Sequence, residues 1–534
     1  MNIKSIFLVA LSLCTTTLNA QRVDPDSIPP ERLSCTSIMV GKKASADGSV
    51  MTSHTCDGNY RAWMDIVPGT KYERDTTATV YTGRMHTDHS TGARGMKQAG
   101  IVPVKGTTYN FLNTAYPCLN EKQLGIGETT IGGRKELENP KGMFMIEELE
   151  RLALQQCTTA REAIRLMGDL VKEYGYGDSG ECLTIADPDE VWMFEIFGEG
   201  PDAIGGVWAA VRIPDDHVGI SANISRISKI DLNDPDNYMA SDNVTEVAKK
   251  MGFWDGKEPF RFWKAYSGTN YFNEPKNFSI REYYLMKKLN SSLKADFDDE
   301  ELPFSIKPDN KLSVADVMEL LTETYEGSEY DMTKNLKVAR RNNEKVDSVT
   351  SPMANPWMTS EMMKMLNGIK EGTVKNWRTV SVPQCAYSTV IQLRDWLPDD
   401  VGGVAWVAFD NPGQSPRIPI FSGTLDLPDC FKVDGQLRHD ENAALWAFRR
   451  ANKLSTLKWG VTRDKMTKAR RHFIKKGVSE MPFVESQYDE IMKNEGSDAA
   501  REFLTDYTAD FAGAAILKWN ELGKQFWSMF GRAF

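Results

Sequence analysis

The residue best suited to chemistry is Cys35, because the segment before it has the composition of a removable leader. Residues 21–34 hold three prolines and charges of both signs, which favours an extended chain that packs poorly. Residues 35–40, Cys-Thr-Ser-Ile-Met-Val, then read as a β-strand. A freed α-amine titrates at about 7.7–8.0, against about 10.4 for lysine, so a terminal Cys35 would combine a thiol nucleophile with a base. A flexible leader in front of a buried, non-catalytic cysteine would give the same sequence pattern. The pattern alone therefore does not decide between a removable leader and a merely flexible one.

Two charged residues, Asp57 and Arg61, are expected near Cys35 because the chain folds back between them. The Asp-Gly pair at residues 47–48 is a strong hairpin signal. In a hairpin whose turn is centred there, the residue numbers of directly paired positions add up to about 95, so Cys35 would lie opposite position 59 or 60. The carboxylate and guanidinium could then orient the amine of the cysteine and lower the pKa of its thiol. An ordinary hairpin with a surface ion pair is the alternative.

Several blocks of the sequence resemble the cysteine dipeptidases of the N-terminal-nucleophile superfamily. The segment that begins at Cys35, Cys-Thr-Ser-Ile-Met-Val-Gly-Lys-Lys-Ala-Ser-Ala-Asp-Gly-Ser, is similar to the start of these enzymes. The group includes bacterial dipeptidase A enzymes and the secernins, with bile-salt hydrolases and penicillin V acylases as more distant relatives. The other similar blocks are residues 119–126, 183–187, 190–195, 208–216, 220–227, 388–394 and 419–423.

The resemblance implies a fold and a reaction. The fold is α+β, the four-layer αββα sandwich of N-terminal-nucleophile hydrolases, with a helical insertion. In the reaction, Cys35 attacks the scissile carbonyl of a dipeptide and forms a thioester, which water then hydrolyses. Attack by the same thiol on the Ser34–Cys35 peptide would remove the leader autocatalytically, although removal by another protease stays open.

The resemblance also implies roles for further residues. Asp57 matches the family carboxylate that fixes the amine of the nucleophile. Asn223 is the candidate side-chain donor to the oxyanion, and the backbone around Thr129 is a second candidate. Family members usually carry an arginine three residues before this carboxylate, where this chain has His54.

Two other arginines, Arg61 and Arg226, are therefore candidates to supply the missing positive charge.

No metal and no cofactor is expected. The six histidines are scattered without a His-Glu-x-x-His motif. Residues 125–130, Gly-Ile-Gly-Glu-Thr-Thr, lack the third glycine of a dinucleotide fingerprint and the Gly-Lys-Ser/Thr of a phosphate loop. A Gly-x-Ser-x-Gly nucleophile elbow is absent as well.

The chain divides into a leader and one large unit. Residues 1–20 resemble a signal peptide, with a lysine, a short apolar run and a small residue at position 20. Residues 21–34 would be a propeptide, and residues 35–534 the dipeptidase domain, with a helical insertion at about 232–350 and a helical region at about 436–534. We therefore expect an exported protein, periplasmic or secreted.

Charge and hydropathy limit the partners. A net charge of −10 and a pI of about 5.4 argue against nucleic-acid binding. After the signal peptide no segment is apolar for long enough to anchor the chain in a membrane. Dipeptides are the expected partners, and a homo-oligomer stays open. The rival functions are an amidase resembling bile-salt hydrolase or penicillin V acylase, and a non-catalytic, secernin-like binding protein.

Overall fold

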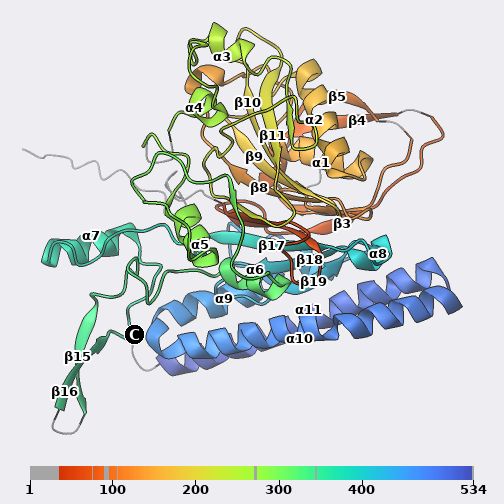
Figure 1. The fold of residues 1–534 in the computed structure, drawn as a ribbon. Helices are drawn as coiled ribbons and strands as arrows, with labels where there is room; N and C mark the ends of the chain where they lie inside the picture. Colours follow the sequence, from red (N-terminus) through yellow and green to blue (C-terminus); the bar gives the residue numbers. More distant parts are fainter. Residues whose placement is uncertain are drawn as a thin grey trace, which may run out of the picture.

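A computed structural model describes residues 35–74, 76–89, 95–104, 106–269, 274–342 and 345–531. The predicted signal peptide and propeptide, residues 1–34, lie outside the described residues. Figure 1 shows two large sheets, with helices on both sides and a projecting β-hairpin. This mixture of sheets and helices agrees with the predicted α+β class.

Two large antiparallel sheets form the centre of the described structure. The strands of the first sheet are, in spatial order, β14 (Ser305–Ile306), β12 (Val218–Ser221), β1 (Ser37–Val40), β2 (Val50–Asp57), β17 (Cys385–Leu393), β18 (Val404–Phe409) and β19 (Ile418–Phe421). Those of the second sheet are β13 (Tyr238–Ala240), β11 (Gly206–Arg212), β10 (Val191–Gly198), β9 (Glu181–Ala186), β8 (Gly125–Thr130), β7 (Leu119–Asn120), β6 (Phe111–Asn113) and β3 (Asp65–Val67). Because β1 and β2 lie inside their sheet, neighbouring strands hold the residues at their ends on both sides.

The two sheets face each other, and helices cover their outer faces. Strands β1, β2 and β17 contact β8 of the other sheet. Figure 1 shows α1 (Ile146–Gln156) and α2 (Ala160–Tyr174) against the eight-stranded sheet. The long helices along the seven-stranded sheet are α9 (Ala444–Thr456), α10 (Trp459–Asn494) and α11 (Ser497–Phe530). Strand β1, which follows Cys35, is thus deep in the molecule.

The smaller elements lie mostly between residues 232 and 402. The helices there are α3 (Glu246–Lys250), α4 (Phe262–Tyr266), α5 (Ile280–Leu289), α6 (Val314–Leu320), α7 (Ser360–Ile369) and α8 (Asp399–Gly402). The paired strands outside the main sheets are β4 (Thr76–Thr82) with β5 (Lys97–Val104), and β15 (Lys337–Asn342) with β16 (Lys345–Thr350). Helix α5 packs against β12, and α6 packs against β17, so part of this region joins the core beside β1.

Local sequence signals explain several of these elements. A capping box begins α2, because Thr159 accepts a hydrogen bond from the Glu162 backbone and the Glu162 side chain accepts one from the Thr159 backbone. Ile164, Met167 and Val171 follow on the buried face of α2. Strand β10, which is buried throughout, is a nearly continuous apolar run.

The predicted fold-back after Cys35 is present, but its predicted register is wrong. Val40 pairs with Met51, so paired positions sum to 91 rather than about 95. The connection is longer than a two-residue turn, because Lys43 and Ala46 donate backbone hydrogen bonds to Asp215 and Leu312 instead of across the hairpin. This register places Cys35 opposite Cys56, next to Asp57.

Among the described residues no helix is both long and apolar enough to cross a membrane.

Candidate active site

Cys35 lies immediately before β1 and is almost completely buried, with 1% of its surface exposed. The neighbouring strand fixes its position, since the Thr36 backbone donates to Thr55 Oγ1 at 2.8 Å and the Thr55 backbone donates to the Thr36 carbonyl at 3.1 Å. Burial, and next the charge of Glu128, raise the pKa of the Cys35 thiol, while the Asp57 backbone N–H lowers it. Without removal of the residues before Cys35, the thiol is therefore protonated at neutral pH.

Asp57 ends β2 and is fully buried beside Cys35. Its Oδ2 accepts hydrogen bonds from Arg378 Nη2 at 2.7 Å and from Thr55 Oγ1 at 3.0 Å. Burial raises the pKa of this carboxyl, and Arg378 opposes the rise. The other oxygen, Oδ1, accepts no hydrogen bond from the described residues and is buried. One oxygen of Asp57 is thus available to an amine at position 35.

Arg281, from α5, links Cys35 to Asn223. Its Nη1 donates to the Cys35 carbonyl at 2.6 Å and to Thr36 Oγ1 at 3.1 Å. Its Nη2 donates to the Ala222 carbonyl at 2.8 Å and to Asn223 Oδ1 at 3.0 Å. One buried guanidinium therefore holds the start of β1 and the residues after β12 in a fixed relation.

Asn223 has an unusual backbone conformation that is consistent with a positioned side chain. Its φ is 62°, in the left-handed region, where asparagine is among the more tolerated residues. Because Arg281 binds Oδ1, the amide nitrogen must point the other way, and Nδ2 donates to the Thr130 carbonyl at 2.7 Å. The structure thus brings Cys35, Asp57 and Asn223 into one buried site.

His54 occupies the family arginine position but carries no charge. It is 1% exposed, and its Nδ1 lies 2.6 Å from the Glu128 carbonyl oxygen. Burial lowers the pKa of His54 to about 4, so the ring is neutral at pH 7. The positive charges beside Cys35 and Asp57 belong instead to Arg281 and Arg378.

The remaining predicted site residues have other partners. The Thr129 hydroxyl lies 2.6 Å from Ser221 Oγ, between the two sheets. Arg61 donates to Asn113 Oδ1 at 2.7 Å and to the Thr114 carbonyl at 2.5 Å. Arg226 is held by Asn277 and Pro303. Among the described residues, neither arginine has a hydrogen bond or ion pair with Cys35 or Asp57.

The sequence analysis missed Arg281, Arg378 and the side chain of Glu128. Arg281 and Arg378 are separated from their partners by 246 and 321 positions, and the register error had placed Arg61 too close to the cysteine. The capping box of Ser279 and Glu282 predicts a helix around Arg281, but a local signal cannot predict which distant residue that helix contacts.

One group of side chains has the spacing of metal ligands. Ligand atoms of Cys35, His54 and Glu128 all lie within 4.8 Å of one another. All seven cysteines of the described residues are free, so no disulfide constrains this group. A thiol, an imidazole and a carboxylate could bind a soft divalent ion, but the same three groups also fit a thiol catalyst with a polar surround.

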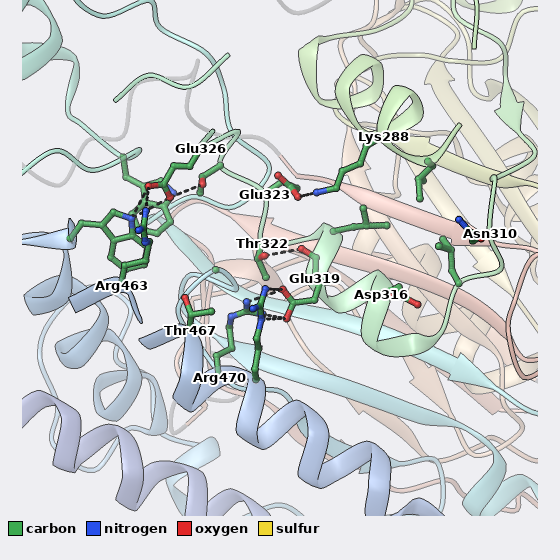
Figure 2. A pocket seen from close by; sticks show the side chains of 18 of the residues that line it. Lys288, Asn310, Asp316, Glu319, Thr322, Glu323, Glu326, Arg463, Thr467 and Arg470 are labelled. Atoms are coloured by element: carbon green, nitrogen blue, oxygen red, sulfur yellow. Dashed lines mark hydrogen bonds and ion pairs between the residues drawn. The ribbon is translucent and has the colours of Figure 1, made fainter. Parts of the chain in front are cut away.

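Two surface pockets differ in their relation to this site. A pocket of about 210 Å³ adjoins it, because Arg378 and Gln384 line the pocket and flank Asp57 and Gly58. A pocket of about 550 Å³ between α6 and α10 is lined by other residues, and Figure 2 shows three of its glutamates, Glu319, Glu323 and Glu326, paired with basic side chains. Glu319 there binds Arg470 and Arg471. The smaller pocket is therefore the better candidate for access to Cys35.

Comparisons with known proteins agree on one family. The family model described as "Peptidase family C69" matches residues 34–472. A probable dipeptidase of Latilactobacillus sakei is 28% identical over 416 residues, which cover 75% of this chain and 77% of the relative. A probable dipeptidase of Salmonella dublin is 27% identical over 415 residues, or 73% of this chain and 81% of the relative. A probable dipeptidase B of Lactococcus lactis is 25% identical over 434 residues, or 77% and 79%.

Proposed function

The chain belongs to peptidase family C69, and from this premise we propose that it is a dipeptidase with Cys35 as its nucleophile. The membership confirms the family resemblance of the sequence blocks and the expected class, a cysteine-type dipeptidase among the hydrolases. The observation that carries the nucleophile assignment is the placement of Cys35 between the unoccupied oxygen of Asp57 and the Arg281–Asn223 pair.

The proposed mechanism starts with removal of residues 1–34. The new α-amine of Cys35 binds Asp57 Oδ1, which orients it, and takes the proton of the thiol as the thiolate attacks the scissile carbonyl. The amine then returns the proton to the leaving amino group. Water attacks the resulting thioester with the same amine as base, which releases the second product and restores the thiol.

The oxyanion of the tetrahedral intermediate needs donors that are already oriented. Asn223 Nδ2 is the proposed side-chain donor, and Arg281 supports it by fixing the amide through Oδ1. The Thr130 carbonyl accepts from Nδ2 in the substrate-free chain, so substrate would have to replace that contact. Arg378 supplies the charge that the family arginine gives elsewhere, since it binds Asp57 directly and His54 is neutral.

The finer assignments belong to the same proposal. The N-terminal-nucleophile sandwich is supported by two facing sheets with Cys35 at the start of an inner strand. Export and self-activation are supported by the leader composition and by a family match that begins at residue 34, one residue before the cysteine. The amidase and the non-catalytic alternatives are not favoured, because the relatives reported above are named dipeptidases.

The test compares the wild-type protein with a Cys35→Ala variant. Intact mass and N-terminal sequencing measure removal of the leader, and the release of free amino acids measures turnover. We expect the wild-type chain to begin at Cys35 and to hydrolyse dipeptides, and the variant to do neither. Cys35→Ser should keep the geometry and react slowly, because a hydroxyl is the weaker nucleophile at neutral pH. Full dipeptide hydrolysis by Cys35→Ala would refute the proposal.

A further inference from the structure

A group of buried carboxyl groups lies behind the nucleophile without the cations that usually accompany such groups. The buried acid cluster consists of Glu128 on β8, Glu181 on β9, and Glu147 and Glu150 on α1; each is at most 2% exposed. Both carboxyl oxygens of Glu147 and of Glu150, and one oxygen each of Glu128 and Glu181, have no hydrogen-bond partner among the described residues. Buried charges are ordinarily paired, so this cluster needs an explanation.

Glu148, on the same helix, shows that the fold does pair buried acids elsewhere. Glu148 is fully buried and binds Arg84 and Arg151, the latter at 2.7 Å. Its neighbours Glu147 and Glu150 receive no such cation in the described structure. The absence of a partner is therefore specific to the side of α1 that carries these two residues.

A tyrosine adds a second, independent unpartnered group. Tyr176 is 0% exposed, and its hydroxyl makes no hydrogen bond to the described residues. Burial raises the pKa of this phenol, and the charges of Asp178 and of the cluster acids Glu181, Glu147 and Glu128 raise it further. The Tyr176 hydroxyl and the cluster's carboxyl oxygens without partners among the described residues thus leave several hydrogen-bond acceptors available.

The cluster reaches the reacting atoms through Glu128. A carboxylate oxygen of Glu128 lies within 4.8 Å of Cys35 Sγ. Burial, and next the charge of Glu128, raise the pKa of the Glu181 carboxyl. In a dipeptide, standard geometry places the α-nitrogen about 2.5 Å from the carbonyl carbon that the thiol attacks. A carboxylate that holds this nitrogen must therefore lie within a few ångströms of Sγ, as Glu128 does.

We propose that the buried acid cluster is the subsite for the free α-ammonium group of the substrate, with Glu128 as its direct acceptor and Glu181 behind it. This proposal rests on the proposed dipeptidase function and adds the group that selects a free amine over an acylated one. An ammonium ion donates three hydrogen bonds and brings the positive charge that the cluster lacks. An N-acylated nitrogen is uncharged and keeps only one N–H, so it would leave the buried carboxylates without a counter-charge.

A shared metal ion explains the cluster less well. Glu128 comes within ligand spacing of Cys35 and His54, but no three of the four cluster acids have that spacing among the described residues. Calcium requires six to eight oxygen ligands around one point. Burial raises the pKa of Glu147 to about 8, as expected for a carboxyl that has no cationic hydrogen-bond partner among the described residues.

The experiment compares alanyl-alanine with its N-acetyl derivative, using the processed wild-type enzyme and Glu128→Gln and Glu181→Gln variants. We expect the wild type to prefer the free amine strongly. Glu128→Gln should lower the ratio of kcat/KM for the free dipeptide to kcat/KM for the N-acetyl derivative by roughly 10- to 100-fold, the value of one charge-assisted hydrogen bond. Glu181→Gln should also reduce the preference for the free dipeptide, but by a smaller factor.

Glu195→Gln is the matched control for loss of a buried carboxyl. Glu195 is also fully buried, and burial raises its pKa to about 7, but Ser225, Arg226 and Ile227 satisfy it on β10. Its substitution should lower thermal stability and keep the ratio of the two substrates. The rate of Cys35 alkylation by iodoacetamide reports the nucleophile in every variant.

The outcomes separate this inference from the proposed function. If the wild type cleaves neither substrate, the dipeptidase function fails and the inference falls with it. If the wild type cleaves free dipeptides but Glu128→Gln keeps the preference, only the inference fails. A shifted pH profile of Cys35 alkylation with an unchanged substrate ratio would also overturn it, since Glu128 would then serve the amine of Cys35. Stabilisation by millimolar calcium that Glu128→Gln abolishes would assign the cluster to a metal.

Discussion

Replacement of Arg281 by lysine tests whether the active site is held together by one guanidinium. Arg281 makes four hydrogen bonds, of 2.6, 3.1, 2.8 and 3.0 Å, to Cys35, Thr36, Ala222 and Asn223. Lysine keeps the charge, but its single nitrogen cannot reach both pairs of acceptors at once. If two of these bonds are lost at about 1.5 kcal/mol each, unfolding becomes easier by about 3 kcal/mol.

The effect on catalysis follows from Asn223. Without a donor to Oδ1, the amide can rotate, and Nδ2 is no longer aimed. Loss of one oxyanion donor costs about 2.7–4 kcal/mol in the transition state, so kcat should fall by about 100- to 1,000-fold. The assays are urea unfolding and kcat at saturating dipeptide.

Arg226→Lys is the comparison, because Arg226 is equally buried and its guanidinium binds three oxygens of Asn277 and Pro303. It should lose similar stability and much less kcat. Equal losses of kcat in the two variants, or a normal kcat in Arg281→Lys, would refute the role given to Arg281. Equal losses would also return Arg226 to the list of functional candidates.

Two further predictions concern packing and pH. A methyl group at Gly127 would lie 2.6 Å from Thr184 Oγ1 and closer still to the Ser53 carbonyl, so Gly127→Ala should destabilise the sheet contact by about 1–3 kcal/mol in urea unfolding. Gly132→Ala, with nothing within 4 Å, is the control, and equal effects would contradict the packing explanation. Burial raises the pKa of Glu147 from 4.5 to about 8, so its contribution to stability is present below pH 4.5 and lost as pH rises towards 8. Glu147→Gln should flatten that fall in melting temperature across pH 5–8, and an unchanged slope would show that Glu147 is not the titrating group.

The parts of the structure that depend on neighbouring residues could be predicted from the sequence. The capping box at Thr159 begins α2, and the Asp-Gly signal announces a fold-back. The register of that fold-back could not be predicted, because contacts of the connection with Asp215 and Leu312 replace the expected tight turn. A shift of four in the sum of paired positions moved Asp57 towards the cysteine and Arg61 away from it.

In the candidate site too, some residues could be predicted from the sequence and others depend on contacts between distant parts of the chain. Cys35, Asp57 and Asn223 could be proposed because a family resemblance marks each position. Arg281 and Arg378 could not, because their value depends on tertiary contacts with strands hundreds of residues earlier. His54 shows why the resemblance alone misleads, since a neutral buried ring at that position cannot provide the charge of an arginine.

The position of Arg281 changes how the region after residue 232 should be understood. Ser279 begins α5 with a capping box and places Arg281 in the first turn, while Ile280, Leu285 and Met286 pack into the core beside β1. The helix therefore has to fold against the seven-stranded sheet before the guanidinium can reach Cys35 and Asn223. Because the apolar contacts of α5 and the polar contacts of Arg281 form together, this part of the region is a structural component of the active site. An insertion that only covered the site could be removed without disturbing Asn223. Removal of α5 would instead leave the Asn223 amide and the start of β1 without Arg281, the donor that they share.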